Sequence, residues 1–183
     1  MTTLEVAANG VTTLAILLAG RNSIHTWWTG IIGAVLFGIL FYQTKLYADV
    51  TLQGFFIATG VLGWMRWRRG RTDPQLPVGR IKPLALVPIG IGGVLVTLGY
   101  GTLLHRFTDA YAPFWDSLIL VASVIAQFLL IGRKIETWYF WLLVNIVAVP
   151  LYLSRDLWLT SGLYVAYLIN AVIALRVWRR ELA

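Results

Sequence analysis

The chain has 183 residues, of which 58% are hydrophobic and only 13% are charged. Soluble domains carry roughly a quarter charged residues, so this chain lacks the polar surface of a water-soluble globule. Cysteine is absent, which excludes disulfides, thiolate catalysis and cysteine-bound metals. The net charge of +7 does not require nucleic-acid binding, because basic residues gather on the cytoplasmic loops of membrane proteins.

Apolar segments follow one another along the whole chain. They cover residues 3–20, 27–43, 47–67, 83–104, 115–131, 138–153 and 157–178. A membrane-spanning helix needs about 20 apolar residues, whereas barrel strands are about 10 residues long with alternating polarity. The sequence therefore predicts an all-α integral membrane protein with seven transmembrane helices.

Lysine and arginine are distributed unevenly over the two predicted sides of the membrane. With the N-terminus outside, only Lys45, Arg106 and Arg155 of the 15 basic residues fall on the outer side. Because basic residues accumulate in short cytoplasmic loops, we expect an outer N-terminus and a cytoplasmic C-terminus. The expected location is the cell inner membrane, crossed several times.

An internal repeat appears when the two ends of the chain are aligned with Thr26 on Thr137. Residues 26–27 and 137–138 are both Thr-Trp, and residues 67–69 and 178–180 are both Trp-Arg-Arg, with no gap between these markers. Three helices reverse the side of the membrane and a fourth restores it, so the two copies must have the same orientation. This pattern predicts a parallel 3+1+3 repeat.

The predicted organisation has three parts. Residues 1–67 form the first three-helix repeat, residues 68–114 a basic cytoplasmic loop, a linker helix and an outer loop, and residues 115–183 the second repeat. Transporters with parallel repeats bind substrate near the midplane, between the repeats.

The sequence lacks the motifs that usually indicate catalysis. There is no GxxxxGK[ST] phosphate loop, and His25 and His105 fall in predicted loops at opposite faces. We therefore expect no enzyme activity, no catalytic residue, no metal and no cofactor. The interior polar residues are neutral: Asn9, Gln53, Gln127, Asn145 and Asn170. They suit an uncharged substrate or a delocalised cation, and they equally suit contacts between helices.

The stretch TWYFWLLVN, residues 137–145, admits two interpretations. At 100° per residue, Trp138, Trp141 and Asn145 share one helix face. Trp138 is expected to anchor the helix at the membrane interface, as are Trp64 and Trp67. Trp141 and Asn145 lie deeper and are expected to form a pocket wall.

Four segments together resemble the PnuC-type vitamin transporters. They are GIIGAVLFGILFYQTKLYADVTLQ (30–53), GWMRW (63–67), FWDS (114–117) and ETWYFWLLVN (136–145). The resemblance runs from about Leu4 to Trp178. It implies a 3+1+3 fold similar to the SWEET sugar carriers, facilitated diffusion of nicotinamide riboside, and cytosolic phosphorylation that traps the product. It also implies a homotrimer and a functional link to a cytosolic kinase that needs no contact with it.

The resemblance also implies a substrate pocket. The candidate residues are Trp138, Trp141, Asn145, Gln53, Gln127 and Tyr164, with the interior Asn170 added for its polarity alone. The family often has asparagine where this chain has Gly33, which leaves the preferred vitamin open.

Nicotinamide riboside carries a flat pyridinium cation, which an indole face attracts by about 2 kcal/mol when desolvated. A phosphorylated nucleotide would call for Arg or Lys in the core of the spans, and none is present there. Thiamine is also a flat cation and stays an alternative, as do riboflavin and deoxynucleosides of the same family. The alternative from another class is a seven-helix receptor that binds a ligand without transporting it.

Overall fold

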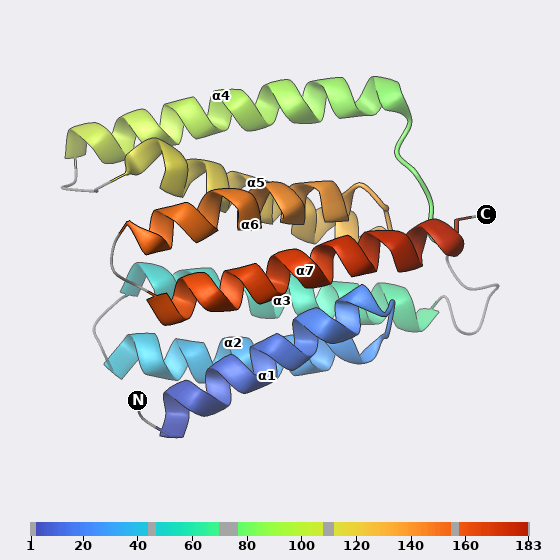
Figure 1. Cartoon of the computed structure of the whole chain (residues 1–183), viewed down its shortest axis with the longest axis horizontal. Helices are drawn as coiled ribbons and strands as arrows, with labels where there is room; N and C mark the ends of the chain where they lie inside the picture. The colour runs from blue at the N-terminus through green and yellow to red at the C-terminus, as the bar shows by residue number, and fades with distance from the viewer. Residues whose placement is uncertain (1–2, 44–46, 70–76, 108–111, 155–157, 183) are drawn as a thin grey trace. The chain divides into compact units, whose positions relative to one another are not determined.

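The computed structural model describes residues 3–43, 47–69, 77–107, 112–154 and 158–182, and most of these residues lie in α-helices. In chain order the helices are α1 (Thr3–Gly20), α2 (His25–Gln43), α3 (Tyr47–Arg69), α4 (Pro83–Phe107), α5 (Pro113–Ile131), α6 (Thr137–Leu153) and α7 (Trp158–Arg180) (Figure 1). Their ends lie within a few residues of the predicted spans, so the prediction of an all-α fold is confirmed.

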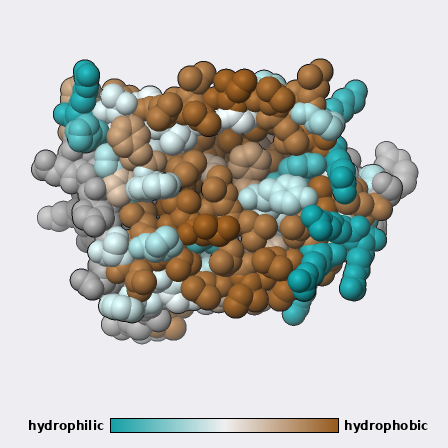
Figure 2. Space-filling model, turned by 45° about the horizontal axis from the view of Figure 1, so that its top comes forward, coloured by the Kyte–Doolittle hydropathy of each residue, from teal (hydrophilic) through white to brown (hydrophobic). Residues whose placement is uncertain are grey.

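Several helices have the length and composition of membrane spans. Among the described residues, α4, α5 and Ser161–Arg180 of α7 are long and apolar enough to cross a bilayer, and α1, α2 and α6 contain shorter apolar segments. Hydrophobic residues cover much of the surface visible in Figure 2. An apolar surface of this extent is typical of a membrane or protein interaction surface.

The helices belong to two compact units. One contains Met1–Pro77 together with Arg180–Leu182, and the other contains Val78–Arg179. In the first unit α1 packs against α2 and α2 against α3; in the second, α4 packs against α5 and α5 against α6. Helix α7 lies antiparallel to α6, because Trp138 meets Trp178 while Tyr152 meets Tyr164.

The turn between α1 and α2 is closed by hydrogen bonds to the end of α1. Asn22 adopts a left-handed backbone conformation, with φ of 53°, and the Ser23 amide donates to the Leu18 carbonyl at 3.0 Å. The Thr26 hydroxyl donates to the Ala15 carbonyl at 2.8 Å. This side-chain bond ties the start of α2 to the body of α1.

The turn between α5 and α6 repeats these features, each at the position that the alignment of Thr26 with Thr137 pairs with the first turn. Arg133 has φ of 49°, the Lys134 amide donates to the Leu129 carbonyl at 2.9 Å, and the Thr137 hydroxyl donates to the Ala126 carbonyl at 2.8 Å. Asparagine tolerates the left-handed region better than arginine does, so the matching geometry does not come from local propensity.

A buried tryptophan pair joins the second and third helix in each case. The rings of Trp27 and Trp67 lie 5.3 Å apart at 86°, and those of Trp138 and Trp178 lie 5.5 Å apart at 82°. All four side chains are at most 3% exposed. The prediction of an interfacial anchor is therefore wrong for Trp67 and Trp138, whereas Trp64 is 38% exposed, as an interfacial residue should be.

Candidate functional site

Helix α6 brings the W-x-x-W-x-x-x-N residues to its packed side. Trp138 is 2% exposed and Asn145 is 4% exposed, while Trp141 between them is partly exposed. Their spacing of three and four residues keeps them within about 60° of one another around the helix. The face predicted from the sequence is therefore the face that α6 turns toward its neighbours.

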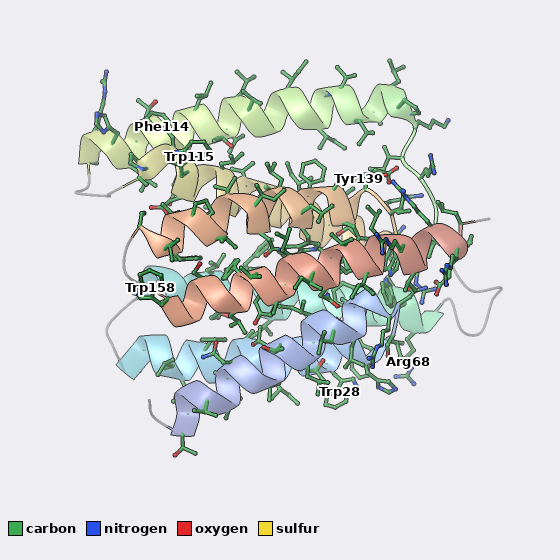
Figure 3. The ribbon with its side chains drawn as sticks, viewed as in Figure 1. Trp28, Arg68, Phe114, Trp115, Tyr139 and Trp158 are labelled. Carbon is green, nitrogen blue, oxygen red and sulfur yellow. The ribbon has the colours of Figure 1, made fainter. Side chains whose placement is uncertain are left out.

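Exposed aromatic residues lie at both ends of the helices of the second unit. Figure 3 places Phe114 and Trp115 at the start of α5 and Trp158 at the start of α7, whereas Tyr139 lies near the opposite ends of these helices, at the start of α6. Trp115 is 57% exposed, Trp158 67% and Tyr139 45%. Trp and Tyr gather at the two bilayer interfaces, so these exposed residues indicate how deep in the membrane the candidate residues lie. Asn145 lies about 9 Å along the axis from the Tyr139 level, at 1.5 Å per residue.

The neighbouring stretch of α7 is built from small and polar residues. Ala171 and Ala174 are almost fully buried, and Asn170 is 9% exposed. The Trp138–Trp178 and Tyr152–Tyr164 contacts fix the register, which puts Asn145 at about the level of Ala171. The second unit therefore holds two buried asparagines, Asn145 and Asn170, on two helices that pack against each other.

Tyr164 belongs to a cluster of three tyrosines in the second unit. Its ring lies 5.0 Å from the Tyr152 ring and 5.6 Å from the Tyr167 ring. Tyr164 is a candidate from the sequence, whereas Tyr152 and Tyr167 are not. The three-residue spacing of Tyr164 and Tyr167, which puts them on one helix face, was the signal that could have found the latter.

Two candidate glutamines lie on other helices. Gln127 is half-buried on α5, in the second unit. Gln53 is half-buried on α3, in the first unit, where its Cβ lies 3.7 Å from the place that a Cβ on Gly38 would occupy. Six of the seven candidates thus belong to the second unit and Gln53 belongs to the first.

The indole N–H of Trp138 is buried and has no hydrogen-bond partner among the described residues. An unpaired buried donor often indicates a missing ligand. The indole N–H of Trp27 is in the same condition, although α2 has neither a second tryptophan nor an asparagine at the equivalent positions. The unpaired donor is therefore a property of both tryptophan pairs and does not by itself mark a binding site.

Gly33 has a packing reason to be glycine. A Cβ at this position would lie 2.5 Å from the hydroxyl oxygen of Thr12 on α1. Any side chain at this position would therefore require the Thr12 side chain to move. The departure from the family pattern at this position goes with the close crossing of these two helices.

Comparisons with known proteins show the family of this chain. The family model described as "Nicotinamide mononucleotide transporter" matches residues 2–180. The chain belongs to this family. It is a family of transporters and not of enzymes, and its members are membrane proteins.

Characterised relatives cover most of the chain. The nicotinamide riboside transporter PnuC of Escherichia coli (strain K12) is 28% identical over 90% of this chain and 80% of its own length. The riboflavin/roseoflavin transporter RibM of Streptomyces davaonensis is also 28% identical, over 95% of this chain and 83% of its own length. A crystal structure of the vitamin B3 transporter PnuC superposes with a TM-score of 0.74 at 25% identity, covering 97% of this chain and 81% of that one.

Proposed function

We propose that the protein carries nicotinamide riboside across the cell inner membrane by facilitated diffusion. The observation that carries the proposal is the W-x-x-W-x-x-x-N face of α6, in a chain that matches the transporter family from residue 2 to residue 180. Trp141 offers an indole face to the pyridinium cation. Asn145 offers a neutral amide for the hydroxyl or carboxamide groups, and Gln127, Tyr164 and Asn170 of the same unit are proposed to complete the pocket.

The proposed topology has seven spans, an outer N-terminus and a cytoplasmic C-terminus. Helices α1–α3 and α5–α7 are proposed to be parallel repeats joined by α4, as in SWEET-like carriers. The support is the turn geometry and the tryptophan pairs that the two sets of helices share at aligned positions. Such a repeat would let one half rock against the other around a site near the midplane.

Net uptake requires that the product be removed, because facilitated diffusion stops when the concentrations on the two sides are equal. We propose that a cytosolic kinase phosphorylates the riboside and so traps it, without needing contact with the transporter. We also propose a homotrimer, for which the family resemblance is the support. Light scattering of the protein in nanodiscs tests the oligomer.

Uptake by proteoliposomes tests the transport proposal. Vesicles containing the purified protein should equilibrate labelled nicotinamide riboside at a saturable rate, whereas empty vesicles should not. A proton or sodium gradient should leave the final distribution unchanged, and a kinase with ATP inside the vesicles should raise accumulation. Saturable binding without flux would instead indicate a receptor.

Riboflavin is the second candidate substrate, because the RibM transporter matches this chain at the same identity as the E. coli relative. Thiamine stays a candidate on its charge and flat shape. A thermal-shift series with nicotinamide riboside, riboflavin, thiamine and deoxynucleosides separates them, since stabilisation follows the ratio of ligand concentration to Kd.

A further inference from the structure

A short segment before α4 is bound to the α5–α6 turn. We call residues 78–81 the strap. The Gly79 amide donates to the Arg133 carbonyl at 3.0 Å, and the Ile135 amide donates to the Gly79 carbonyl at 3.0 Å, which makes a parallel β-bridge between Gly79 and Lys134. Val78 is 3% exposed and Ile135 is 1% exposed. The strap is therefore packed onto the residues that lead into α6.

Glu136 adds a third hydrogen bond to this contact. Its carboxylate accepts the Ile81 amide N–H at 3.2 Å, across 55 positions in the sequence. Glu136 occupies the N-cap position of α6 but makes no capping bond to that helix. Its side chain is thus used on the strap, although it stands where a cap would normally satisfy the first amides of the helix.

Because Glu136 is buried, its carboxylate needs this hydrogen bond to compensate for the loss of water. The residue is 6% exposed, and a carboxylate removed from water is costly unless hydrogen bonds or opposite charge compensate it. The N-terminus of α6 supplies a favourable dipole, and the Ile81 amide supplies the directed bond. An acid whose only role was to make the surface polar would not be buried in this way.

The start of α6 is consequently held from three directions. The strap holds it through Glu136, α5 holds it through the Thr137 hydroxyl on Ala126, and α7 holds it through the Trp138–Trp178 ring contact. Trp141 follows within the next turn of the same helix. A rotation or shift of the helix start would therefore move Trp141 and Asn145 together.

We infer that Glu136 is a positioning residue for substrate binding, which sets α6 through its hydrogen bond to the Ile81 amide of the strap. The inference rests on the proposed function, because its consequence is the affinity for the transported vitamin. Glu136 touches no substrate in this account. The carboxylate acts as a hydrogen-bond acceptor, so an amide at the same position should serve almost as well.

Two variants remove the bond from opposite sides. Glu136→Ala deletes the acceptor, and Ile81→Pro deletes the donor N–H without changing α6. Each should raise the half-saturating concentration of nicotinamide riboside about 5- to 10-fold in proteoliposomes, with the maximum rate per folded protein changed less than 2-fold. Glu136→Gln should stay within 2-fold of wild type. The matched control is Arg80→Ala, an exposed residue beside Ile81, which should change neither quantity.

Hydrogen exchange measures how firmly the strap is bound to the α5–α6 turn, independently of transport. The amides of Gly79 and Ile135 should exchange at least 10-fold faster in Glu136→Ala and in Ile81→Pro than in wild type. If the wild-type protein transports none of the vitamins, the proposed function fails, whereas the exchange result still decides whether Glu136 holds the strap. Where Glu136→Ala does not fold, Ile81→Pro supplies both measurements.

Three outcomes would overturn the inference. Unchanged exchange in both variants would show that the bond does not hold the strap. Faster exchange with an unchanged half-saturating concentration would show that the bond between Glu136 and the strap is purely structural. Equal losses in Glu136→Gln and Glu136→Ala would show that the negative charge matters rather than the acceptor.

Discussion

Gly30 and Ala34 of α2 stand where α6 has Trp141 and Asn145, although the two helices start alike. Both begin with Thr-Trp, both threonines bond a carbonyl of the preceding helix at 2.8 Å, and both tryptophans meet a buried partner edge-on. The shared features form a packing frame. The candidate binding chemistry has been added to that frame on α6 only.

The third helices differ in a related way. Gly63 of α3 stands where α7 has Ala174, and a Cβ on Gly63 would lie 2.4 Å from the Trp27 ring. Ala174 is fully buried near the equivalent tryptophan pair and carries its methyl group there. At this position α2 and α3 thus approach too closely for a Cβ, whereas α7 accommodates the methyl group of Ala174.

The largest effect is expected from the tryptophans of the frame. Trp27→Ala and Trp138→Ala should each lower the free energy of unfolding by about 3 kcal/mol, because each removes a fully buried indole and leaves a cavity. The two losses should agree within about 1 kcal/mol if the frames are equivalent. Denaturant unfolding in detergent measures both.

The control for this pair is Trp28→Ala, on a side chain that is 43% exposed. It should stay within about 0.5 kcal/mol of wild type. A large loss at Trp138 with none at Trp27 would show that the first pair is dispensable and that the two halves are not equivalent.

Of the two equivalent helices α2 and α6, only α6 should affect substrate binding. Trp141→Ala should raise the Kd for nicotinamide riboside about 30-fold, since a desolvated cation–indole contact is worth about 2 kcal/mol. Asn145→Ala should raise it about 10-fold through the loss of a buried hydrogen-bonding amide. Calorimetric titration of the folded fraction measures both, and Trp138→Ala should weaken binding less than either.

Tyr139→Ala is the matched control on the same helix, because Tyr139 is 45% exposed and its hydroxyl bonds Arg179 rather than the packed face. Its Kd should stay near that of wild type. If Trp141→Ala and Tyr139→Ala weaken binding equally, the W-x-x-W-x-x-x-N face is not the pocket.

The helices could be predicted from the sequence because their cause is local. Long apolar runs leave little alternative to a helix in lipid, and the charged and turn residues between the runs set their ends. The burial of Trp138 could not be predicted in the same way. An indole beside Arg133 and Lys134 fits an interfacial belt equally well, and only its contact with Trp178 on the following helix excludes that interpretation.

The role of Glu136 was also beyond a local pattern. Its partner is a backbone N–H at Ile81, and no side-chain motif indicates which amide a distant carboxylate accepts. The face of α6 was easier to predict from the sequence, because helical periodicity alone puts Trp138, Trp141 and Asn145 together. Which of the candidate residues line one pocket depends on packing between helices that sequence spacing does not specify.

A smaller effect tests how far the two third helices have diverged. Gly63→Ala, which installs the residue of the second half, should destabilise the protein by about 1–2 kcal/mol, because the added methyl overlaps the Trp27 ring. Gly54→Ala on the same helix has open space around its Cβ and should stabilise by up to about 1 kcal/mol through helix propensity. Thermal unfolding distinguishes the two signs; stabilisation by both would mean that α3 can move away from Trp27 without cost.

The smallest effect concerns the threonine bonds that begin α2 and α6. Thr26→Val and Thr137→Val should each cost about 0.6 kcal/mol, the average for a side-chain hydrogen bond between membrane helices. Thr102→Val is the control, because the Thr102 hydroxyl donates to the Leu98 carbonyl of its own helix, and it should cost less. Since the two turns lie in separate compact units, the double variant should show the sum of the two losses. If the loss in the double variant exceeds the sum of the two single losses by more than about 0.5 kcal/mol, the two turns are energetically coupled. The packing frame would then be one element rather than two copies.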